Sequence, residues 1–328
     1  MNQVGYHGAM GSVPPDALAR LLDELRPGTD TPGHFRDRNA RGVVLPKGEA
    51  RALVAFTACP GPKIDLARRA GRLDTIGADL VNRLVNDVLA AGATPLLFVL
   101  HVGTDRCDAA VLEDVMAGVA KGCRGGYLPL VDAGLSETPT TYGTGVCDLF
   151  GTIVGSAPAD RRLDGSAITG GDVILCLPST GLHSDGYPEA ARALEVLGLG
   201  PDDELPGAGT TVRKALLAVH KSYRGVLLEP IARGWLHGAA HVGAGGLRGS
   251  LERAMPEGRR AALDPEAWPV PPLFSTIASA AGLADTERDR VFNMGIGMAL
   301  IVPPRHADDV RHWMDLWHEP CHPIGRIN

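Results

Sequence analysis

The apolar residues between Leu73 and Gly103 predict a buried helix that runs directly into a buried strand. Two adjoining rows of residues at four-residue spacing define one face of the helix. The first row is Ile76, Leu80, Leu84 and Val88, and the second is Gly77, Val81, Val85 and Leu89. Gly92 and Pro95 end this helix, and the apolar run from Leu96 to Val102 predicts the strand. We expect the rest of the chain to be organised around this stretch.

The other side of the predicted helix is polar, and it carries Asp79, Asn82, Arg83, Asn86 and Asp87. Asn and Asp are unfavourable inside helices because their side chains compete for local backbone hydrogen bonds. A solvated face, or a structural hydrogen bond to a neighbouring loop, would explain Asn86 and Asp87. A carboxylate here could also hold a magnesium ion that bridges phosphates. These two residues alone leave both interpretations open.

Outside this stretch the apolar pattern predicts further strands and helices. Short apolar runs predict strands at Ala52 to Phe56, Tyr127 to Val131, Asp148 to Val154, Asp172 to Leu177, Leu236 to Ala240, Ala299 to Val302 and Pro323 to Asn328. Helical periodicity covers residues 14–26, Asp108 to Lys121, the segment after Tyr187, Leu247 to Met255 and Arg305 to Trp317. Pro27 to Gly48 lacks periodicity and predicts a loop. Pro158 to Gly171 predicts a boundary between two domains, residues 1–160 and 161–328.

Composition and charge narrow the class of protein. The 328 residues are 45% hydrophobic and 21% charged, which is typical of globular proteins. A net charge of −6 without a Lys/Arg cluster argues against a nucleic-acid partner and favours a small molecule. The sequence contains neither a signal-peptide pattern nor a membrane-length apolar run, so we expect a cytoplasmic protein without a membrane partner. Six cysteines without a Cys-x-x-Cys pair fit a reducing compartment.

Two segments near the N-terminus carry cations that could meet a phosphate. The strand Ala52 to Phe56 leads into the turn Thr57 to Lys63, which would place a lysine ammonium at the strand end, although the spacing of a P-loop is missing. Arg36, Arg38 and Arg41 in the preceding loop could also reach a phosphate, with solvated surface as the simpler explanation.

Small and polar residues follow several predicted strands. Asp132 to Glu137 comes after one strand, at a position where ligands often bind in α/β folds. Pro178 to Tyr187, which contains His183, and His241 to Gly246 each lead from a strand into a helix, whose free amides can bind an anion. A lone histidine in such a loop is more often structural than catalytic. The glycines of Phe292 to Met298 suggest close approach by a backbone or a ligand.

Three stretches together resemble the phosphoribosylformylglycinamidine cyclo-ligase (aminoimidazole ribonucleotide synthetase) family. They are DTIGADLVNRLVNDVLAAGATPLLF, the loop STGLHSDGY, and AHVGAGG followed by FNMGIGM, in the family's order. The resemblance implies a mixed α/β fold with a β-rich N-terminal domain (residues 1–160) that pairs in a homodimer, and a mixed α/β C-terminal domain (161–328). It also implies ATP and Mg²⁺ as cofactors. The γ-phosphate would activate an amide oxygen, after which a nearby nitrogen attacks the same carbon and closes an imidazole ring.

The resemblance also assigns roles to individual residues. The implied catalytic residues are His183, Lys63 and Asp87. The implied nucleotide site comprises Thr57, Lys63, Asn86, Asp87, Gly243, Gly245 and Gly246. The implied substrate contacts are Ser184, Asp185, Gly186, Tyr187 and Asn293. The implied metal ligands are Asp87, Asp132 and Glu137.

This sequence departs from the family pattern at three places. The family's Thr-Asp-Gly-Val-Gly-Thr-Lys turn has Ala58 where the aspartate stands, and its Gly-Gly-Glu-Thr-Ala-Glu segment has become Asp132 to Glu137. The Arg-bearing segment His34 to Arg41 replaces a glycine-rich loop. Loss of carboxylates should weaken metal and ATP binding unless Asp65, Asp132 or Glu137 substitutes.

Three hypotheses follow from this combination. The first is a diverged ATP-dependent cyclo-ligase that acts on a related amide or amidine substrate, which could be phosphorylated, in a specialised pathway. The second is the housekeeping cyclo-ligase of purine biosynthesis. The third is a non-catalytic homologue that binds a nucleotide or metabolite. The Ala58 substitution favours the third, whereas the intact His183 loop and the Asn86-Asp87 pair favour the first.

Overall fold

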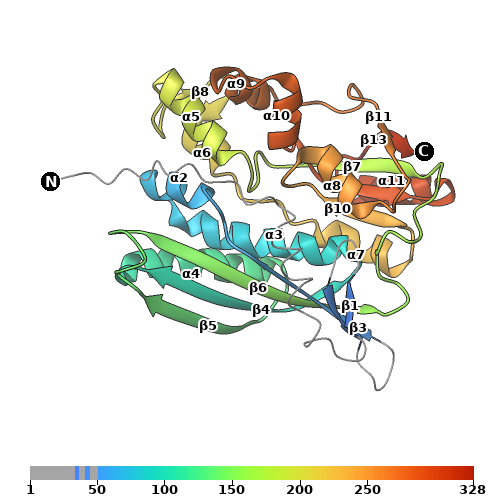
Figure 1. Cartoon of the computed structure of the whole chain (residues 1–328), viewed down its shortest axis with the longest axis horizontal. Coiled ribbons are helices and arrows are strands. Elements are labelled where there is room, and N and C mark those ends of the chain that lie inside the picture. Colours follow the sequence, from blue (N-terminus) through green and yellow to red (C-terminus); the bar gives the residue numbers. More distant parts are fainter. Residues whose placement is uncertain (1–33, 37–40, 45–50) are drawn as a thin grey trace.

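The computed structural model describes residues 34–36, 41–44 and 51–328, so the helix predicted over residues 14–26 lies outside the described residues. Within these residues the chain forms two large sheets, with helix α3 (Ile76–Ala90) running between them (Figure 1). α3 contacts strands of the first sheet on one side, and helix α7 (Arg224–Ala232) and strand β10 (Gly238–His241) on the other. The predicted organising helix is therefore confirmed.

The first sheet has six strands in the order β1-β2-β3-β6-β4-β5. They are β1 (His34–Arg36), β2 (Arg41–Val44), β3 (Arg51–Ala58), β4 (Thr94–Thr104), β5 (Leu130–Glu137) and β6 (Cys147–Pro158). β4 and β5 are parallel and are joined by α4 (Ala109–Gly125), whereas the other neighbours are antiparallel. α3 and α4 cover the same face, and both apolar rows of α3 are buried there.

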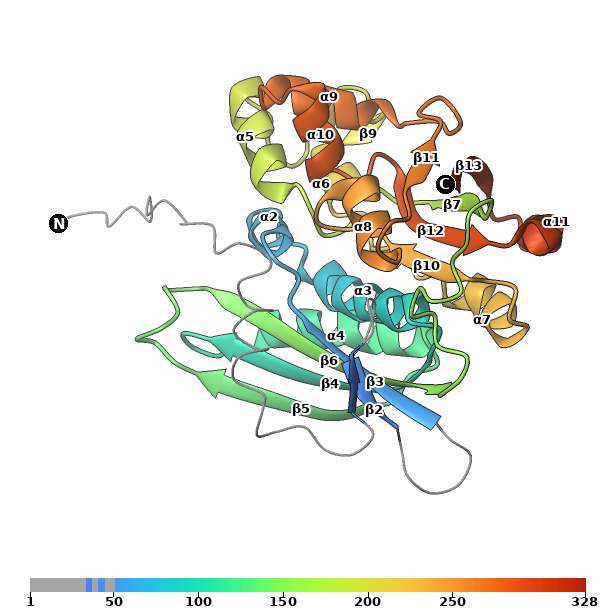
Figure 2. The ribbon, with the colours of Figure 1, turned by 45° about the vertical axis from the view of Figure 1, so that its right-hand side comes forward.

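The opposite face of this sheet carries no helix of the described residues (Figure 2). Phe150, Thr152 and Val154 alternate along β6 on this face, and Phe150 is 38% exposed. An uncovered sheet face with apolar side chains is a common docking surface. The homodimer implied by the family resemblance would bury it, and that homodimer stays a prediction.

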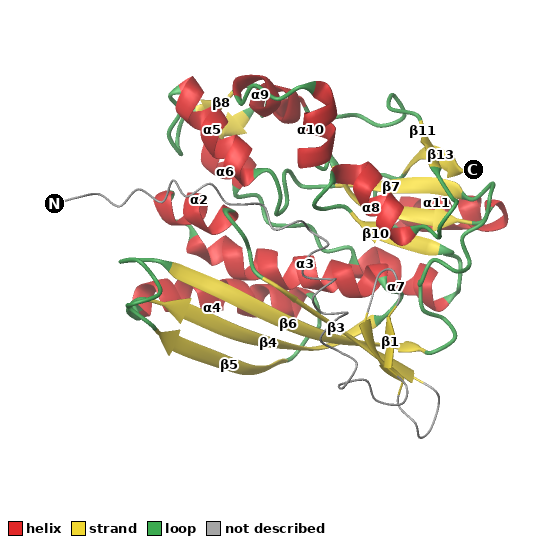
Figure 3. Cartoon of the chain, in the orientation of Figure 1, coloured by secondary structure: helices red, strands yellow, loops and turns green. Residues whose placement is uncertain are grey.

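The second sheet has five antiparallel strands in the order β10-β12-β7-β13-β11 (Figure 3). The strands besides β10 are β7 (Val173–Pro178), β11 (Ala261–Leu263), β12 (Ile296–Val302) and β13 (His322–Ile327), and a separate hairpin pairs β8 (Glu204–Leu205) with β9 (Thr210–Thr211). The other helices are α2 (Lys63–Arg69), α5 (Tyr187–Leu197), α6 (Val212–Leu216), α8 (Gly246–Ala254), α9 (Pro272–Ala280), α10 (Asp285–Val291) and α11 (Ala307–Leu316), with 3₁₀ turns at Leu73–Thr75 and Pro304–His306. None of the helices in the described part of the chain could cross a membrane.

Two predictions from the sequence pattern were wrong. The segment Pro27 to Gly48 was expected to be a loop, but its described residues form β1 and β2, which are too short to reveal a period of two. The strand expected at Tyr127 to Val131 begins only at Leu130 and continues to Glu137, because parallel pairing with β4 supplies its hydrogen bonds. Residues 132–137 are therefore inside an edge strand. The predicted domain boundary lies in the connection from β6 to β7 and stays a prediction.

A buried ion pair joins α2 to α3. Lys63 and Asp79 are 1% and 2% exposed, and the Lys63 Nζ lies 2.9 Å from each carboxylate oxygen of Asp79. Lys63 also donates to the Ala218 carbonyl at 2.8 Å, and Asp79 accepts from the His220 amide at 2.6 Å. Burial lowers the pKa of Lys63 and raises the pKa of Asp79, and their mutual attraction opposes both shifts. The pair therefore binds the segment before α7, residues 218–223, to helices α2 and α3.

Replacing Asp79 with Asn should destabilise the chain by about 3–5 kcal/mol, because it leaves the Lys63 ammonium buried without a counter-charge. Chemical denaturation gives the free energy of unfolding. Asp74→Asn is the matched control, since the Arg72–Asp74 pair has a similar 2.8 Å separation but is about half exposed, and exposed pairs contribute roughly 1 kcal/mol or less. Equal losses in the two variants would contradict this account of the buried pair.

Candidate active site

The polar side of α3 binds the backbone of the segment before α7. Asn82 donates to the His220 carbonyl and Asn86 donates to the Lys221 carbonyl, both at 2.7 Å, and Asn86 Oδ1 accepts from the Tyr223 amide at 3.0 Å. Asn86 is fully buried. Asn86 therefore makes the structural hydrogen bonds of the first interpretation, and both its amide nitrogen and its amide oxygen bond to backbone groups.

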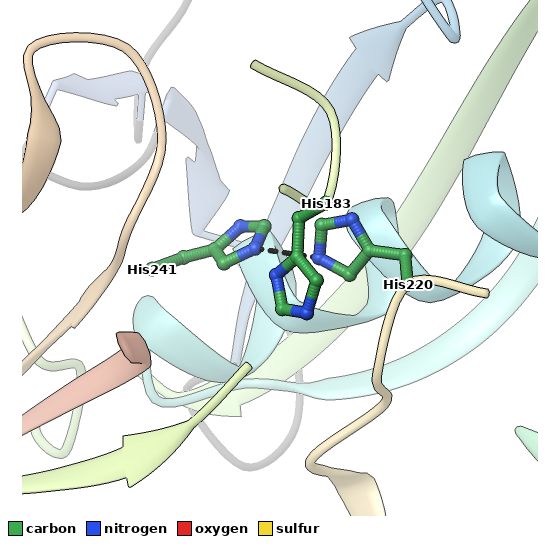
Figure 4. Close-up of side chains that lie close together, drawn as sticks. All are labelled: His183, His220 and His241. Carbon is green, nitrogen blue, oxygen red and sulfur yellow. Dashed lines mark hydrogen bonds between the residues drawn. The ribbon is translucent and has the colours of Figure 1, made fainter. Parts of the chain in front are cut away.

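Asp87, one position further on, belongs to a chain of polar contacts between side chains. Asp87 Oδ1 lies 2.7 Å from His241 Nδ1. The other ring nitrogen of His241, Nε2, lies 3.0 Å from His220 Nε2 (Figure 4). His220 Nδ1 in turn lies 3.2 Å from the hydroxyl of Ser184, in the loop that follows β7. His183 in the same loop stacks on His220, with ring centroids 3.9 Å apart. The fold thus gathers residues from four separate segments.

His183 has an unusual backbone and an incomplete set of partners. Its φ of 61° lies in the left-handed region, which a non-glycine residue adopts only when its surroundings require it. Its Nε2 accepts from the Thr180 amide at 3.1 Å, whereas its Nδ1 is buried without a hydrogen-bond partner. Burial holds the pKa of His183 well below its ordinary value, and the neighbouring His241 and Lys63 add to this effect. Burial does the same to the pKa of His220, with His183 adding to it. We therefore expect the His183 and His220 rings to be neutral at pH 7.

Two of the expected substrate contacts hold this loop in place. The Tyr187 hydroxyl donates to the Leu216 carbonyl at 2.6 Å and lies 3.3 Å from the His183 carbonyl. The Asn293 amide donates to the Gly181 carbonyl at 2.8 Å, and its oxygen accepts from the Gly295 amide at 2.9 Å. Both side chains are buried. Both therefore help to position the His183 loop through its backbone carbonyls.

The remaining loop residues differ in how they could serve a ligand. Gly186 and Gly246 have positive φ and no room for a side chain, because a Cβ would collide with Phe292 and with the Asp289 backbone respectively. Asp185 is partly exposed, and burial raises its pKa while Arg83 opposes the shift. The Gly243 amide donates to Ser250 Oγ at 3.2 Å, and Gly245 caps α8 in the left-handed conformation.

Four residues that were expected to contact the nucleotide or the metal lie outside this cluster. Thr57 is exposed on β3, where its hydroxyl is 2.9 Å from that of Thr152. Asp132 and Glu137 are exposed on the edge strand β5, and Glu137 accepts from the Cys107 amide at 2.6 Å. Five residues of extended strand span about 17 Å, so these two carboxylates cannot ligate the same ion. Lys63 is buried against Asp79.

The sequence reasoning did not single out His220 or His241. His241 stood at the start of a glycine-rich segment that was interpreted as an anion site, and His220 belongs to no motif. The available signal was the polar side of α3, because polar residues at helical spacing beside a buried face require a polar partner segment. That signal gives no indication of which segment the partner is.

Comparison with known proteins gives the same family over both halves of the chain. Residues 40–157 match the model described as "AIR synthase related protein, N-terminal domain", and residues 169–328 match "AIR synthase related protein, C-terminal domain". A solved structure titled "AaThiL complexed with AMPPCP and TMP" has a TM-score of 0.66 over 94% of this chain and 89% of that one. At 14% identity it supports the fold alone. The expected two-domain synthetase-like fold is confirmed.

Two curated relatives bear the name phosphoribosylformylglycinamidine cyclo-ligase. The protein of Vigna unguiculata is 39% identical over 293 residues, which cover 89% of this chain and 73% of the relative. The protein of Burkholderia pseudomallei (strain 668) is 38% identical over 320 residues, which cover 95% of this chain and 90% of the relative. The resemblance inferred from the motifs is confirmed, and the chain belongs to the AIR synthase related protein family.

Proposed function

We propose that this chain is an ATP-dependent cyclo-ligase and that its substrate is phosphoribosylformylglycinamidine. The observation that carries the proposal is the gathering of His183, His241 and Asp87 from three distant family motifs into one cluster. The shared name of relatives that are 38–39% identical over most of the chain supports the same substrate. These names favour the housekeeping hypothesis over a specialised paralogue.

The proposed reaction needs an activated amide oxygen and a group that exchanges a proton with the substrate. ATP supplies the activating phosphoryl group, and the protein contributes chiefly positioning and electrostatic stabilisation. His183 is suited to the proton exchange because Nδ1 is its unengaged ring nitrogen. Its Nε2 accepts from Thr180, so the neutral ring carries its proton on Nδ1. Ser184 and Asp185 stand beside it as substrate contacts.

The proposed nucleotide and metal site lies beside the first turn. A cavity of about 320 Å³ there is lined by Asp65, Arg68 and Asp148, among others. Burial raises the pKa of Asp148, and the neighbouring Asp65 carboxylate raises it further. Two carboxylates that face one cavity suit Mg²⁺, which needs only one or two protein ligands when phosphate oxygens supply the rest. Asp65 would then replace the family aspartate that is missing at Ala58.

Asp65→Asn and Asp148→Asn should each weaken Mg²⁺-dependent ATP binding by at least about tenfold and leave metal-free binding less affected, because both carboxylates face the proposed cavity. The substitution keeps the shape of the side chain and removes a charge that contributes on the order of 1–4 kcal/mol beside a cation. Isothermal titration with a non-hydrolysable ATP analogue measures both constants, with the exposed Asp264→Asn as control. Absence of binding at millimolar nucleotide would refute the site.

A second candidate is a cyclo-ligase with a different amide or amidine substrate. Ala58 and the Asp132-Ala133-Gly134 segment differ from the family pattern at positions that organise phosphates in the family. A displaced metal would displace the transferring phosphate, and a shift of about 1 Å can cost on the order of a hundredfold in rate. A specialised substrate could tolerate such a site.

Growth of a purine auxotroph that lacks its own cyclo-ligase separates these candidates. We expect this chain to restore growth without added purine, and the His183→Ala chain, produced at the same level, to fail. Failure of the wild-type chain, together with ATP consumption on another amide, would favour the second candidate. Failure without nucleotide binding would instead favour a non-catalytic homologue.

A further inference from the structure

Three histidines from separate segments meet at one point of the chain (Figure 4). One ring nitrogen of each of His183, His220 and His241 lies within 4.8 Å of the others. His183 and His220 are buried, and the His241 side chain is 9% exposed. Imidazole nitrogen is a preferred ligand of Zn²⁺ and related divalent transition metals, whereas Mg²⁺ prefers oxygen.

The hydrogen bonds of the cluster establish which nitrogens carry protons. The Asp87 carboxylate can only accept, so His241 Nδ1 carries a proton and donates to it. In the state in which both rings are neutral, His241 has its lone pair on Nε2, and His220 Nε2–H donates across the 3.0 Å separation. His220 Nδ1 then accepts from the hydroxyl of Ser184. A single proton thus lies between two ring nitrogens that face each other.

A metal ion can replace that shared proton without a change in the charge of either ring. If the His220 proton moves from Nε2 to Nδ1, the hydroxyl of Ser184 rotates and accepts it, and both Nε2 atoms present lone pairs. Two tetrahedral zinc ligands at 2.0–2.1 Å are about 3.3 Å apart, close to the observed 3.0 Å between these nitrogens. Asp87 and Ser184 then supply the outer hydrogen bonds that orient metal-binding histidines.

His183 provides the third nitrogen. Its Nδ1 is buried without a hydrogen-bond partner, which is unfavourable, and ligation would give this nitrogen a partner. To ligate through Nδ1, the ring must carry its proton on Nε2. It then gives up the bonds from the Thr180 and Lys221 amides and tilts out of its stack on His220. Ion binding therefore reorients the His183 ring.

We propose that His183, His220 and His241 form a three-nitrogen site for Zn²⁺ or a similar divalent transition metal, with a fourth position open to water or a small ligand. This site is separate from the proposed site of the nucleotide-bound Mg²⁺. Asp87 does not ligate the ion of the histidine site and acts on it only through its hydrogen bond with His241. While the ion is bound, His183 is withdrawn from proton exchange.

The test uses the full chain, stripped of metal with a chelator and titrated with Zn²⁺ alone by calorimetry. We expect one ion per chain, and we expect His220→Ala, His241→Ala and His183→Ala each to weaken binding by at least about tenfold. His312→Ala, on the exposed side of α11, should bind as the wild type does. Co²⁺ should give the intense visible absorption of a tetrahedral nitrogen site.

Thermal unfolding of the metal-free variants separates loss of ligands from loss of fold, and His220→Gln, which keeps a polar side chain of similar size, serves if His220→Ala unfolds. Absence of Zn²⁺ binding at millimolar concentration would overturn the proposal. So would wild-type affinity in any folded His183, His220 or His241 variant. No nucleotide is present, so the result is independent of the cyclo-ligase proposal.

Discussion

The polar side of α3 is the constraint on which the candidate site depends. Asp79, Asn82 and Asn86 each bind backbone groups of the segment before α7. Asp79 and Asn86 are buried, so water cannot replace their bonds. His220 belongs to that segment and is fixed in position by these bonds. Asp87 lies on the same side of the same helix and orients His241. One helix thus sets the positions of groups that are more than 130 residues away in sequence.

The apolar half of α3 could be predicted because it depends on periodicity alone. Two four-residue rows and the Gly92–Pro95 terminator are local features, and the structure buries both rows. For the polar half, the sequence left two interpretations of Asn86 and Asp87 open, which were a structural role and a role in metal binding. The structure makes Asn86 a structural hydrogen-bonding residue and turns Asp87 towards a histidine, because the partner segment arrives from the second half of the chain.

Lys63 and Asp132 illustrate what sequence reasoning could not supply. Lys63 was expected in a turn beside phosphates, but it is the first residue of α2 and pairs with Asp79, sixteen residues later. Asp132 was placed after a strand end because the apolar run stops there. Parallel pairing with β4 carries the strand on to Glu137, and such pairing depends on backbone hydrogen bonds rather than on side-chain pattern.

Turnover is the most direct test of the proposal that the chain is a cyclo-ligase whose site is built by α3. The purified chain would be incubated with phosphoribosylformylglycinamidine, ATP and Mg²⁺, and the imidazole product and ADP would be measured. We expect the two to form in equal amounts, with His183→Ala slower by about a hundredfold or more at unchanged thermal stability. No product from folded protein, or an unchanged rate in His183→Ala, would contradict the proposal.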